Sequence, residues 1–223
     1  MDSTVACRPK RNEILEVDIQ PDNVIVGFSS YGQATYENAY NAGMGSNGLT
    51  SGRHDLLHHS YHAKYPESFD INTDEEYIYS GQYSLTDSLE GTPVDIGKAL
   101  LSPTRTYAPI LNKIMQDTTL KGAINGIIHC TGGAQTKVMK FLDKPLHIIK
   151  DSLLEIPPLY KTIHETTGTS MKEMYEVFNM GHRLEIYCDK TIANELISIA
   201  ASFNVEAKII GRCEPNSKKK LTI

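Results

Sequence analysis

A histidine, a threonine and two adjacent glycines occur together near the middle of the chain, within residues 127–134. The apolar residues before them indicate the end of a buried strand, and we expect a helix to begin near Ala134. Gly132 and Gly133 let the backbone bend tightly and leave amide N–H groups that can hold an anion at the helix start. His129 adds a group that titrates near neutral pH. The alternative is an ordinary strand-to-helix turn with a packed histidine.

Cys130 lies next to His129, which raises the alternative of a nucleophilic cysteine. Adjacent strand residues point to opposite faces, so this pair does not easily share a proton. The 4 cysteines are widely spaced and form no Cys-x-x-Cys pair. We therefore expect reduced thiols, with Cys130 and Cys188 buried within strands.

Other segments of the chain also combine glycine with polar side chains. They are Ser29-Ser30-Tyr31-Gly32 after the apolar residues 24–28, Gly45-Ser46-Asn47-Gly48, Ser102-Pro103-Thr104-Arg105-Thr106-Tyr107, and Phe178-Asn179-Met180-Gly181. Loops of this kind commonly hold phosphates through backbone N–H groups. No Gly-x-x-x-x-Gly-Lys-Ser/Thr segment occurs, so a P-loop is excluded.

In combination and in this order, the segments resemble the C-terminal domain of aminoimidazole ribonucleotide synthetase, also called phosphoribosylformylglycinamidine cyclo-ligase. That family carries Ser-Ser-Gly-x-His-Ser-Asn-Gly, Pro-Thr-Arg-x-Tyr, His-x-Thr-Gly-Gly-Gly and Phe-Asn-Met-Gly. The resemblance covers the chain from about Val24 onward. The chain departs from the family pattern at three places. It has an insertion between Gly32 and Gly45, Gly45 in place of the family histidine, and Ala134 in place of the third glycine.

The resemblance implies an ATP- and Mg²⁺-dependent reaction of de novo purine biosynthesis. The formyl-amide oxygen of formylglycinamidine ribonucleotide is phosphorylated, and ring closure to aminoimidazole ribonucleotide releases phosphate. The family's N-terminal half, where the metal ligands are expected, carries Asp-Gly-x-Gly-Thr-Lys, and no such run occurs in these 223 residues. We therefore expect the chain to bind a phosphorylated ribonucleotide substrate, to need that N-terminal half as partner for activity, and to form a homodimer in the full enzyme.

Site residues follow from the resemblance position by position. We expect His129 to have a catalytic, acid/base role. The residues expected to bind substrate or nucleotide are Ser46, Asn47, Gly48, Thr131, Gly132, Gly133, Asn179 and Gly181. Asn179 and Gly181 have the alternative role of a structural joint. Arg105 suits a phosphate fork, but we favour a structural role at the helix start.

Four histidines, His54, His58, His59 and His62, gather in one predicted helix. The spacing of His54, His58 and His62 places them on one face, as in some zinc or nickel sites. No glutamate lies between them and no cysteine is near. We favour an exposed polar face with adventitious metal binding, and assign no metal site.

Composition is that of a globular protein, with 40% hydrophobic and 22% charged residues and a net charge of -5. The negative charge argues against a nucleic-acid partner, and the run Lys218-Lys219-Lys220 is too short to change that. No apolar run is long enough to span a bilayer and no apolar signal region opens the chain, so we expect no membrane partner and a cytoplasmic location.

The alternation of strands and helices predicts an α/β fold, a mixed sheet with helices packed mainly on one face. We expect a polar lead at 1–23 that crosses between domains in a two-domain relative, then one domain at 24–223 with a surface insertion at 66–95. Predicted helices cover 49–65, 106–117 and 158–166, start at Ser170, and run from 189 or 191 to about 203. Predicted strands cover 24–28, 146–150, 183–188, 207–211 and 221–223.

Two other functions remain open. A sister ATP-dependent enzyme, such as formylglycinamidine ribonucleotide synthetase or a selenophosphate- or thiamine-phosphate-forming kinase, shares the architecture. A non-catalytic binding or regulatory module of the same fold is the second. The pairing of His-x-Thr-Gly-Gly with Phe-Asn-Met-Gly favours the cyclo-ligase.

Overall fold

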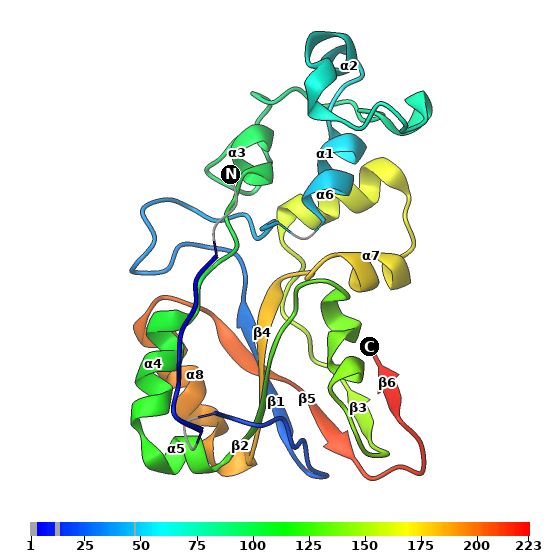
Figure 1. Ribbon diagram of the computed structural model, residues 1–223. Coiled ribbons are helices and arrows are strands. Elements are labelled where there is room, and N and C mark those ends of the chain that lie inside the picture. The colour runs from blue at the N-terminus through cyan, green and yellow to red at the C-terminus, as the bar shows by residue number, and fades with distance from the viewer. Residues whose placement is uncertain (1–3, 12–13, 47) are drawn as a thin grey trace.

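A mixed sheet forms one half of the molecule (Figure 1) in a computed structural model that describes residues 4–11, 14–46 and 48–223. The strands are β1 (Val24–Ser29), β2 (Ile124–His129), β3 (His147–Ile149), β4 (His182–Cys188), β5 (Ala207–Glu214) and β6 (Lys220–Thr222). Their order is β2-β4-β1-β5-β3-β6. Neighbouring strands are antiparallel except β3 and β6, which are parallel.

Short helices make up the rest of the regular structure. The α-helices are α1 (Leu49–Leu56), α2 (Ser60–Lys64), α3 (Ile96–Leu100), α4 (Ala108–Gln116), α5 (Thr118–Gly122), α6 (Pro158–Thr167), α7 (Met171–Val177) and α8 (Ala193–Ser202). The 3-10 helices are η2 (Pro66–Ser68), η3 (Glu75–Tyr77), η4 (Ala134–Lys140) and η5 (Lys190–Ile192). Within the described ranges, no helix has the length and apolar character needed to cross a membrane.

Helices α4, α5 and α8 cover one face of the sheet, to the left in Figure 1. Alternate residues of a strand point to opposite faces, and Val26 lies in the core on this side with Ile110 of α4 and Leu196 of α8. On the other face, Ile25 lies in a smaller core with Val138 of η4. The expected α/β class, with a mixed sheet and helices mainly on one face, is confirmed.

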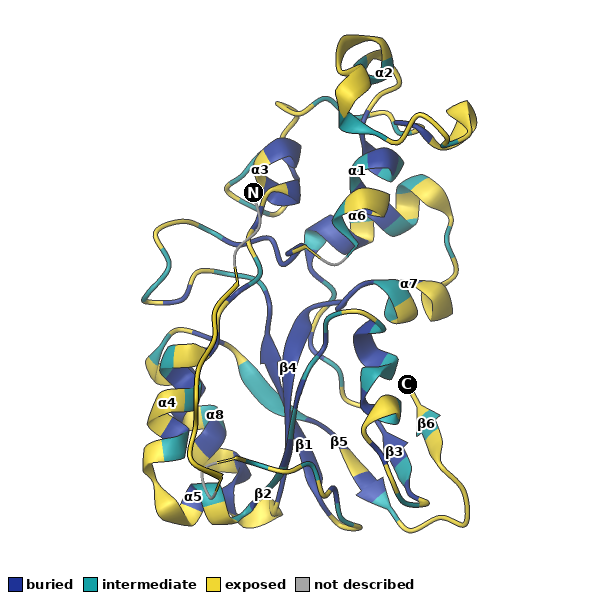
Figure 2. Ribbon diagram, in the orientation of Figure 1, coloured by how far each residue is buried: buried dark blue, intermediate teal, exposed yellow. Residues whose placement is uncertain are grey.

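A third core lies above the sheet, where α1, α3, α6 and α7 meet (Figure 2). Each helix contributes one or more fully buried side chains to it, among them Leu56, Ile96, Ile163 and Met174. The segment 66–95 contributes buried side chains to the same core, namely Ile78, Tyr79 and Leu89. This layer holds the loops that lead into and out of the sheet.

Several predicted helix boundaries are confirmed by their capping geometry. Ser170 caps α7, since its hydroxyl accepts a hydrogen bond from the amide of Glu173 at 3.3 Å. Pro158 opens α6, which ends at Gly168 with a φ of 66°. Asp189 accepts a hydrogen bond from the amide of Thr191, at the start of the η5–α8 segment.

The single helix predicted for 49–65 is wrong, because the chain leaves helical geometry at Leu57 (ψ 144°). Leu57 and His58 form β-bridges to Tyr83 and Gly81, and the amide of His58 donates to the carbonyl of Tyr83 at 2.9 Å. Pairing with a distant segment therefore splits the helix into α1 and α2, and no local proline or glycine marks the break.

The helix expected near Ala134 is a 3-10 helix, η4, rather than an α-helix. Gly133 has a φ of 88°, and Ala134, at the position of the family's third glycine, has a φ of 39°. A positive φ costs a non-glycine residue about 1–2 kcal/mol. The turn therefore keeps its glycine-like path although alanine disfavours it.

Candidate functional site

The glycine-bearing loops meet at one end of β1 and β4, held together by Asn179. Its side-chain amide donates to the carbonyl of Gly43 at 2.8 Å, and its carbonyl oxygen accepts from the hydroxyl of Ser30 at 2.5 Å. The same amide donates to the hydroxyl of Tyr160, and the backbone amide of Gly181 donates to the side-chain carbonyl. These bonds within the protein give Asn179 a positioning role between three loops.

Gly181 is confined by the backbone beside it. Its φ is 109°, and a Cβ there would lie 2.6 Å from the carbonyl oxygen of Glu155. Only glycine combines that conformation with that close approach. Gly181 therefore shapes the turn from Asn179 into β4.

Arg183 of β4 carries a buried guanidinium at the centre of these loops. Its Nη2 donates to the carbonyls of Gly43 (3.0 Å) and Met44 (2.6 Å), and its Nη1 donates to the hydroxyl of Thr104 (3.2 Å). That hydroxyl also accepts from the amide of Ser46 at 3.2 Å. Thr104 therefore links the Ser46 backbone to the arginine.

Arg183 also explains the glycine that stands where the family has a histidine. A Cβ on Gly45 would lie 2.6 Å from Cζ of Arg183, and Gly45 has a φ of 60°. No side chain fits at this position while the guanidinium stays in place. The arginine therefore takes the space that an imidazole at position 45 would need.

The remaining loop residues differ in exposure. Ser46 is exposed, and Asn47 lies outside the described residues. Gly48 has a φ of 82°, and a Cβ on it would lie 2.7 Å from the ring of Phe178. Two expected motifs therefore touch at Gly48 and Phe178.

His129, at the end of β2, is half-buried beside Tyr107, with ring centroids 6.1 Å apart. Burial lowers the pKa of His129, and the positive charges of Arg183 and Lys137 lower it further. Its imidazole is therefore neutral near pH 7, able to donate one hydrogen bond and to accept one proton.

Cys130 points to the opposite face and is buried there. Burial and the negative charge of Glu185 raise the pKa of its thiol well above the usual range. A protonated, enclosed thiol is a poor nucleophile. The geometry does not favour a Cys130–His129 pair.

The turn at Thr131–Gly133 presents donors to solvent. Gly132 is exposed, and the amides of Gly132 and Gly133 have no hydrogen-bond acceptor among the described residues. Lys137, one turn into η4, donates to the hydroxyl of Thr131. Two free amides, an ammonium and a hydroxyl are groups that bind a phosphate.

Carboxylates near the site are already neutralised. Glu37 accepts two hydrogen bonds from Arg105, at 2.8 and 2.7 Å. Glu185 accepts from Lys150 at 2.5 Å and from Tyr187 at 2.8 Å. Phosphate fits the described residues of this site, whereas Mg²⁺, which needs free oxygen ligands, does not.

Arg105 has a structural role, as the sequence favoured. Besides Glu37, its guanidinium donates to the carbonyls of Ser29, Tyr31 and Gly32 at 2.8–2.9 Å. These bonds fix the loop after β1 and leave the guanidinium no donor for a ligand.

Sequence reasoning missed Arg183, Thr104 and Lys137 as site residues. Arg183 carried a signal, because an arginine within an apolar strand must find partners for its charge. Thr104 lies within the Ser102–Tyr107 motif, next to Arg105. Lys137 follows Gly133 by four residues, which places it one turn into the helix after the anion-binding turn.

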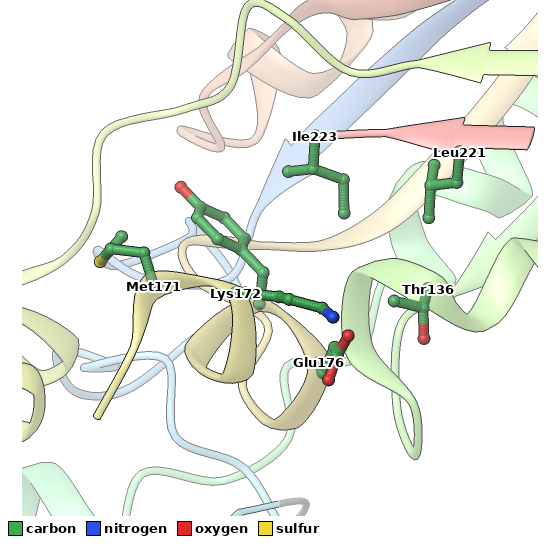
Figure 3. A pocket seen from close by; sticks show the side chains of 7 residues that line it. Thr136, Met171, Lys172, Glu176, Leu221 and Ile223 are labelled. Atoms are coloured by element: carbon green, nitrogen blue, oxygen red, sulfur yellow. The ribbon is translucent and has the colours of Figure 1, made fainter.

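A cavity of about 360 Å³ lies between η4, α7 and β6 (Figure 3). Its lining residues are Thr136, Met171, Lys172, Tyr175, Glu176, Leu221 and Ile223. None of these is an expected site residue. The candidate site is therefore the exposed turn at 131–133 with the loops that Arg183 holds, rather than this cavity.

The fold and the site define an α/β domain whose glycine-bearing loops gather around a buried arginine. Curated phosphoribosylformylglycinamidine cyclo-ligases are similar to nearly the whole chain. The Methanocaldococcus jannaschii protein is 29% identical over 210 residues, 94% of this chain and 50% of its own length. The Carboxydothermus hydrogenoformans protein is 27% identical over 202 residues, 90% of this chain and 48% of its own length. The resemblance inferred from the motifs is confirmed, and the chain spans about half the length of these relatives.

Other comparisons add less. No family model matches the chain. The solved structure of tt0281 from Thermus thermophilus is 14% identical with a TM-score of 0.47, covering 93% of this chain and 51% of that one. T. maritima PurL complexed with ATP is 10% identical with a TM-score of 0.46, covering 95% and 25%. These likenesses carry no argument, and the fold class rests on the strand order.

Proposed function

We propose that this chain acts as the C-terminal half of an ATP-dependent cyclo-ligase of de novo purine biosynthesis, which converts formylglycinamidine ribonucleotide to aminoimidazole ribonucleotide. The similarity to curated cyclo-ligases over nearly the whole chain supports this function. Its own contribution is to bind a phosphate-bearing substrate or nucleotide at the loops around Arg183.

One observation carries the proposal. The free amides of Gly132 and Gly133 lie beside the ammonium of Lys137, while nearby Glu37 and Glu185 are held by cations of the chain itself. Each hydrogen bond to a charged group contributes roughly 1.5–3 kcal/mol. Three such bonds total about 4.5–9 kcal/mol, which after an association cost of about 4 kcal/mol or more corresponds to sub-millimolar binding at best.

Some residues of the site contact the phosphate, and others position the loops that carry them. Thr131, Gly132 and Gly133 contact the phosphate, with Ser46 and Gly48 on the neighbouring loop and Asn47 by its place in the motif. His129, neutral near pH 7, serves as a hydrogen-bond partner or proton acceptor for the substrate. Asn179, Gly181 and Arg183 position these loops.

ATP supplies the phosphoryl group in the family reaction. This chain holds no free carboxylate for Mg²⁺ among its described site residues, so we place the metal ligands on a partner half. The chain's own residues then bind and orient the phosphorylated ligand, and His129 holds or accepts a proton.

A phosphate-release assay with formylglycinamidine ribonucleotide, ATP and Mg²⁺ tests this function. We expect no turnover from the chain alone and turnover on mixing with the N-terminal half of a relative such as the Methanocaldococcus jannaschii enzyme. Enzyme-like turnover by the chain alone, on the order of 1 per second, would contradict the assignment of the metal-binding half to a partner.

Gly45 favours a second candidate, because the imidazole of the family motif has been replaced by space for Arg183. A non-catalytic binding module of the same fold would keep the phosphate site without turnover. The same mixing experiment decides, since the module would bind substrate and show no phosphate release with any N-terminal half.

A further inference from the structure

Two histidines and a glutamate come together where the start of α2 meets η3. Helix α2 lies at the upper end of the molecule in Figure 1. The break at Leu57 separates the four histidines that the sequence places on one helix. His54 is buried, its Nδ1 accepting from the amide of Tyr79, and His58 pairs with Ser60. His59 and His62 are left at the start of α2, facing Glu75.

Their ligand atoms are close enough to share one ion. One nitrogen from each histidine and a carboxylate oxygen of Glu75 all lie within 4.8 Å of one another. Nε2 of His59 is 3.9 Å from Oε1 of Glu75. Zinc bonds of about 2.1 Å at a tetrahedral angle place two ligand atoms about 3.4 Å apart. Small rotations of these accessible side chains close the difference.

Neighbouring groups already set the histidine rings. Nδ1 of His59 lies 3.2 Å from the carbonyl of Ile78, and a carbonyl only accepts, so Nδ1 carries the proton and Nε2 keeps its lone pair for a metal. The ring of His62 stacks on His59 at 5.2 Å and on Phe69 at 4.8 Å. This support is what an outer shell supplies in known metal sites.

The local charge favours a cation. Between Lys64 and Lys98 the chain has no lysine or arginine, and Asp74 and Glu76 flank the glutamate in sequence. The ammonium of Lys64 lies over the ring of Tyr65, 5.2 Å from its centroid. The segment that carries Glu75 is therefore acidic in sequence.

We propose that His59, His62 and Glu75 form a zinc(II) site. Two imidazoles and one carboxylate suit zinc, whereas Mg²⁺ prefers oxygen ligands. The ion would join η3 to α2 and so close the chain between residues 62 and 75 into a loop, with its fourth position open to water. The site lies outside the phosphate-binding loops and is independent of the proposed function.

Zinc titration of the purified chain against a chromophoric chelator tests the site. We expect one equivalent to bind to the parent, with at least a tenfold weaker Kd in His62→Gln and in Glu75→Gln. Matched controls are His58→Gln and Glu76→Gln, each adjacent to a ligand in sequence, and both should bind within twofold of the parent. Equal losses in controls and ligand variants would show adventitious binding to surface histidines and overturn the proposal.

Limited proteolysis gives a second readout. Zinc, but not Mg²⁺, should slow cleavage within residues 66–77 in the parent, and should have no effect in Glu75→Gln. Circular dichroism without metal should be the same for the parent and Glu75→Gln, because Glu75 is exposed (side chain 75%) and a carboxamide at position 75 fits equally well. Cleavage that zinc leaves unchanged in the parent would contradict the joining of η3 to α2.

Discussion

The guanidinium of Arg183 occupies the space into which any side chain at Gly45 would project. It is held there by the carbonyls of Gly43 and Met44 and by the hydroxyl of Thr104. Gly45 has no Cβ, and the guanidinium of Arg183 therefore fits in the space beside it. The loop of residues 43–46 is built on that charge.

Gly45→Ala should destabilise the protein more than Gly32→Ala. Both glycines have a positive φ, but only the Cβ at position 45 meets another group, while nothing lies within 4 Å of the one at position 32. We expect a loss of about 1–2 kcal/mol for Gly32→Ala from the φ alone, and about 1–3 kcal/mol more for Gly45→Ala from overpacking. Urea unfolding measures both, and equal losses would show that Arg183 moves aside freely.

Arg105→Lys should be strongly destabilising. The lysine cannot reproduce the two bonds to Glu37 together with the three carbonyl bonds, and Glu37 would keep a partly buried, poorly paired charge. Removing a buried partner outright costs about 3–5 kcal/mol. Lysine keeps the charge, so we expect a loss of about 1–3 kcal/mol from the carbonyls left without a donor. The control is Arg212→Lys, whose pairs with Asp151 and Glu214 are exposed and should contribute little to stability. Similar unfolding free energies for the two variants would contradict the structural role of Arg105.

Stability should fall between about pH 4.5 and pH 2 because of Glu185. Burial raises the pKa of this carboxyl, but the charge of Lys150 and the hydrogen bond from His182 outweigh it, lowering the pKa from 4.5 to about 2. A depressed carboxyl pKa stabilises the folded state above the unfolded value, and that stability is lost as pH falls toward 2. The contribution is on the order of 3 kcal/mol.

Chemical unfolding across this pH range compares the parent with the double variant Glu185→Gln/Lys150→Met, which removes both charges. The double variant should lose most of the slope of unfolding free energy with pH below 4.5. His182, whose pKa is lowered by burial, adds a loss of stability in the same direction at higher pH. A slope below pH 4.5 that persists in the double variant would assign it to other carboxylates.

The pKa of His129 should rise when phosphate binds. Burial and the charges of Arg183 and Lys137 lower it in the free protein. A bound anion offsets those charges and favours the imidazolium. An NMR pH titration with and without inorganic phosphate measures the change. An unchanged His129 titration at saturating phosphate would place the anion elsewhere.

Local signals predicted the elements that tertiary contacts leave unchanged. The Ser170 cap and Pro158 mark the starts of α7 and α6, and apolar runs mark β1 and β4. The break at Leu57 was not predictable, because it depends on pairing with Tyr83, which is 26 residues away. The geometry of η4 was likewise not predictable, because it depends on the positive φ of both Gly133 and Ala134 in the turn before it.

The sequence predicts which loops form the site, but not which of their residues contact one another. Motif spacing indicates which turns expose amides, and the structure gathers those turns around Arg183. Motif spacing cannot indicate that the side-chain amide of Asn179 donates hydrogen bonds to Gly43 and Tyr160. Nor can it indicate that Gly45 faces the guanidinium of Arg183. Such roles arise from contacts between residues far apart in the chain.

The central claim is that the Thr131–Gly133 turn binds phosphate with Lys137. ATP titration followed by the NMR amide signals of Gly132 and Gly133 tests it directly in the parent, in Lys137→Gln, and in Lys140→Gln, which removes an exposed lysine from the same helix. We expect both amide signals to shift on binding in the parent and in Lys140→Gln. Lys137→Gln should weaken the affinity by about 10–150-fold, the equivalent of one charged hydrogen bond. Amide signals that do not move with ATP, or equal affinities for the two lysine variants, would contradict the claim.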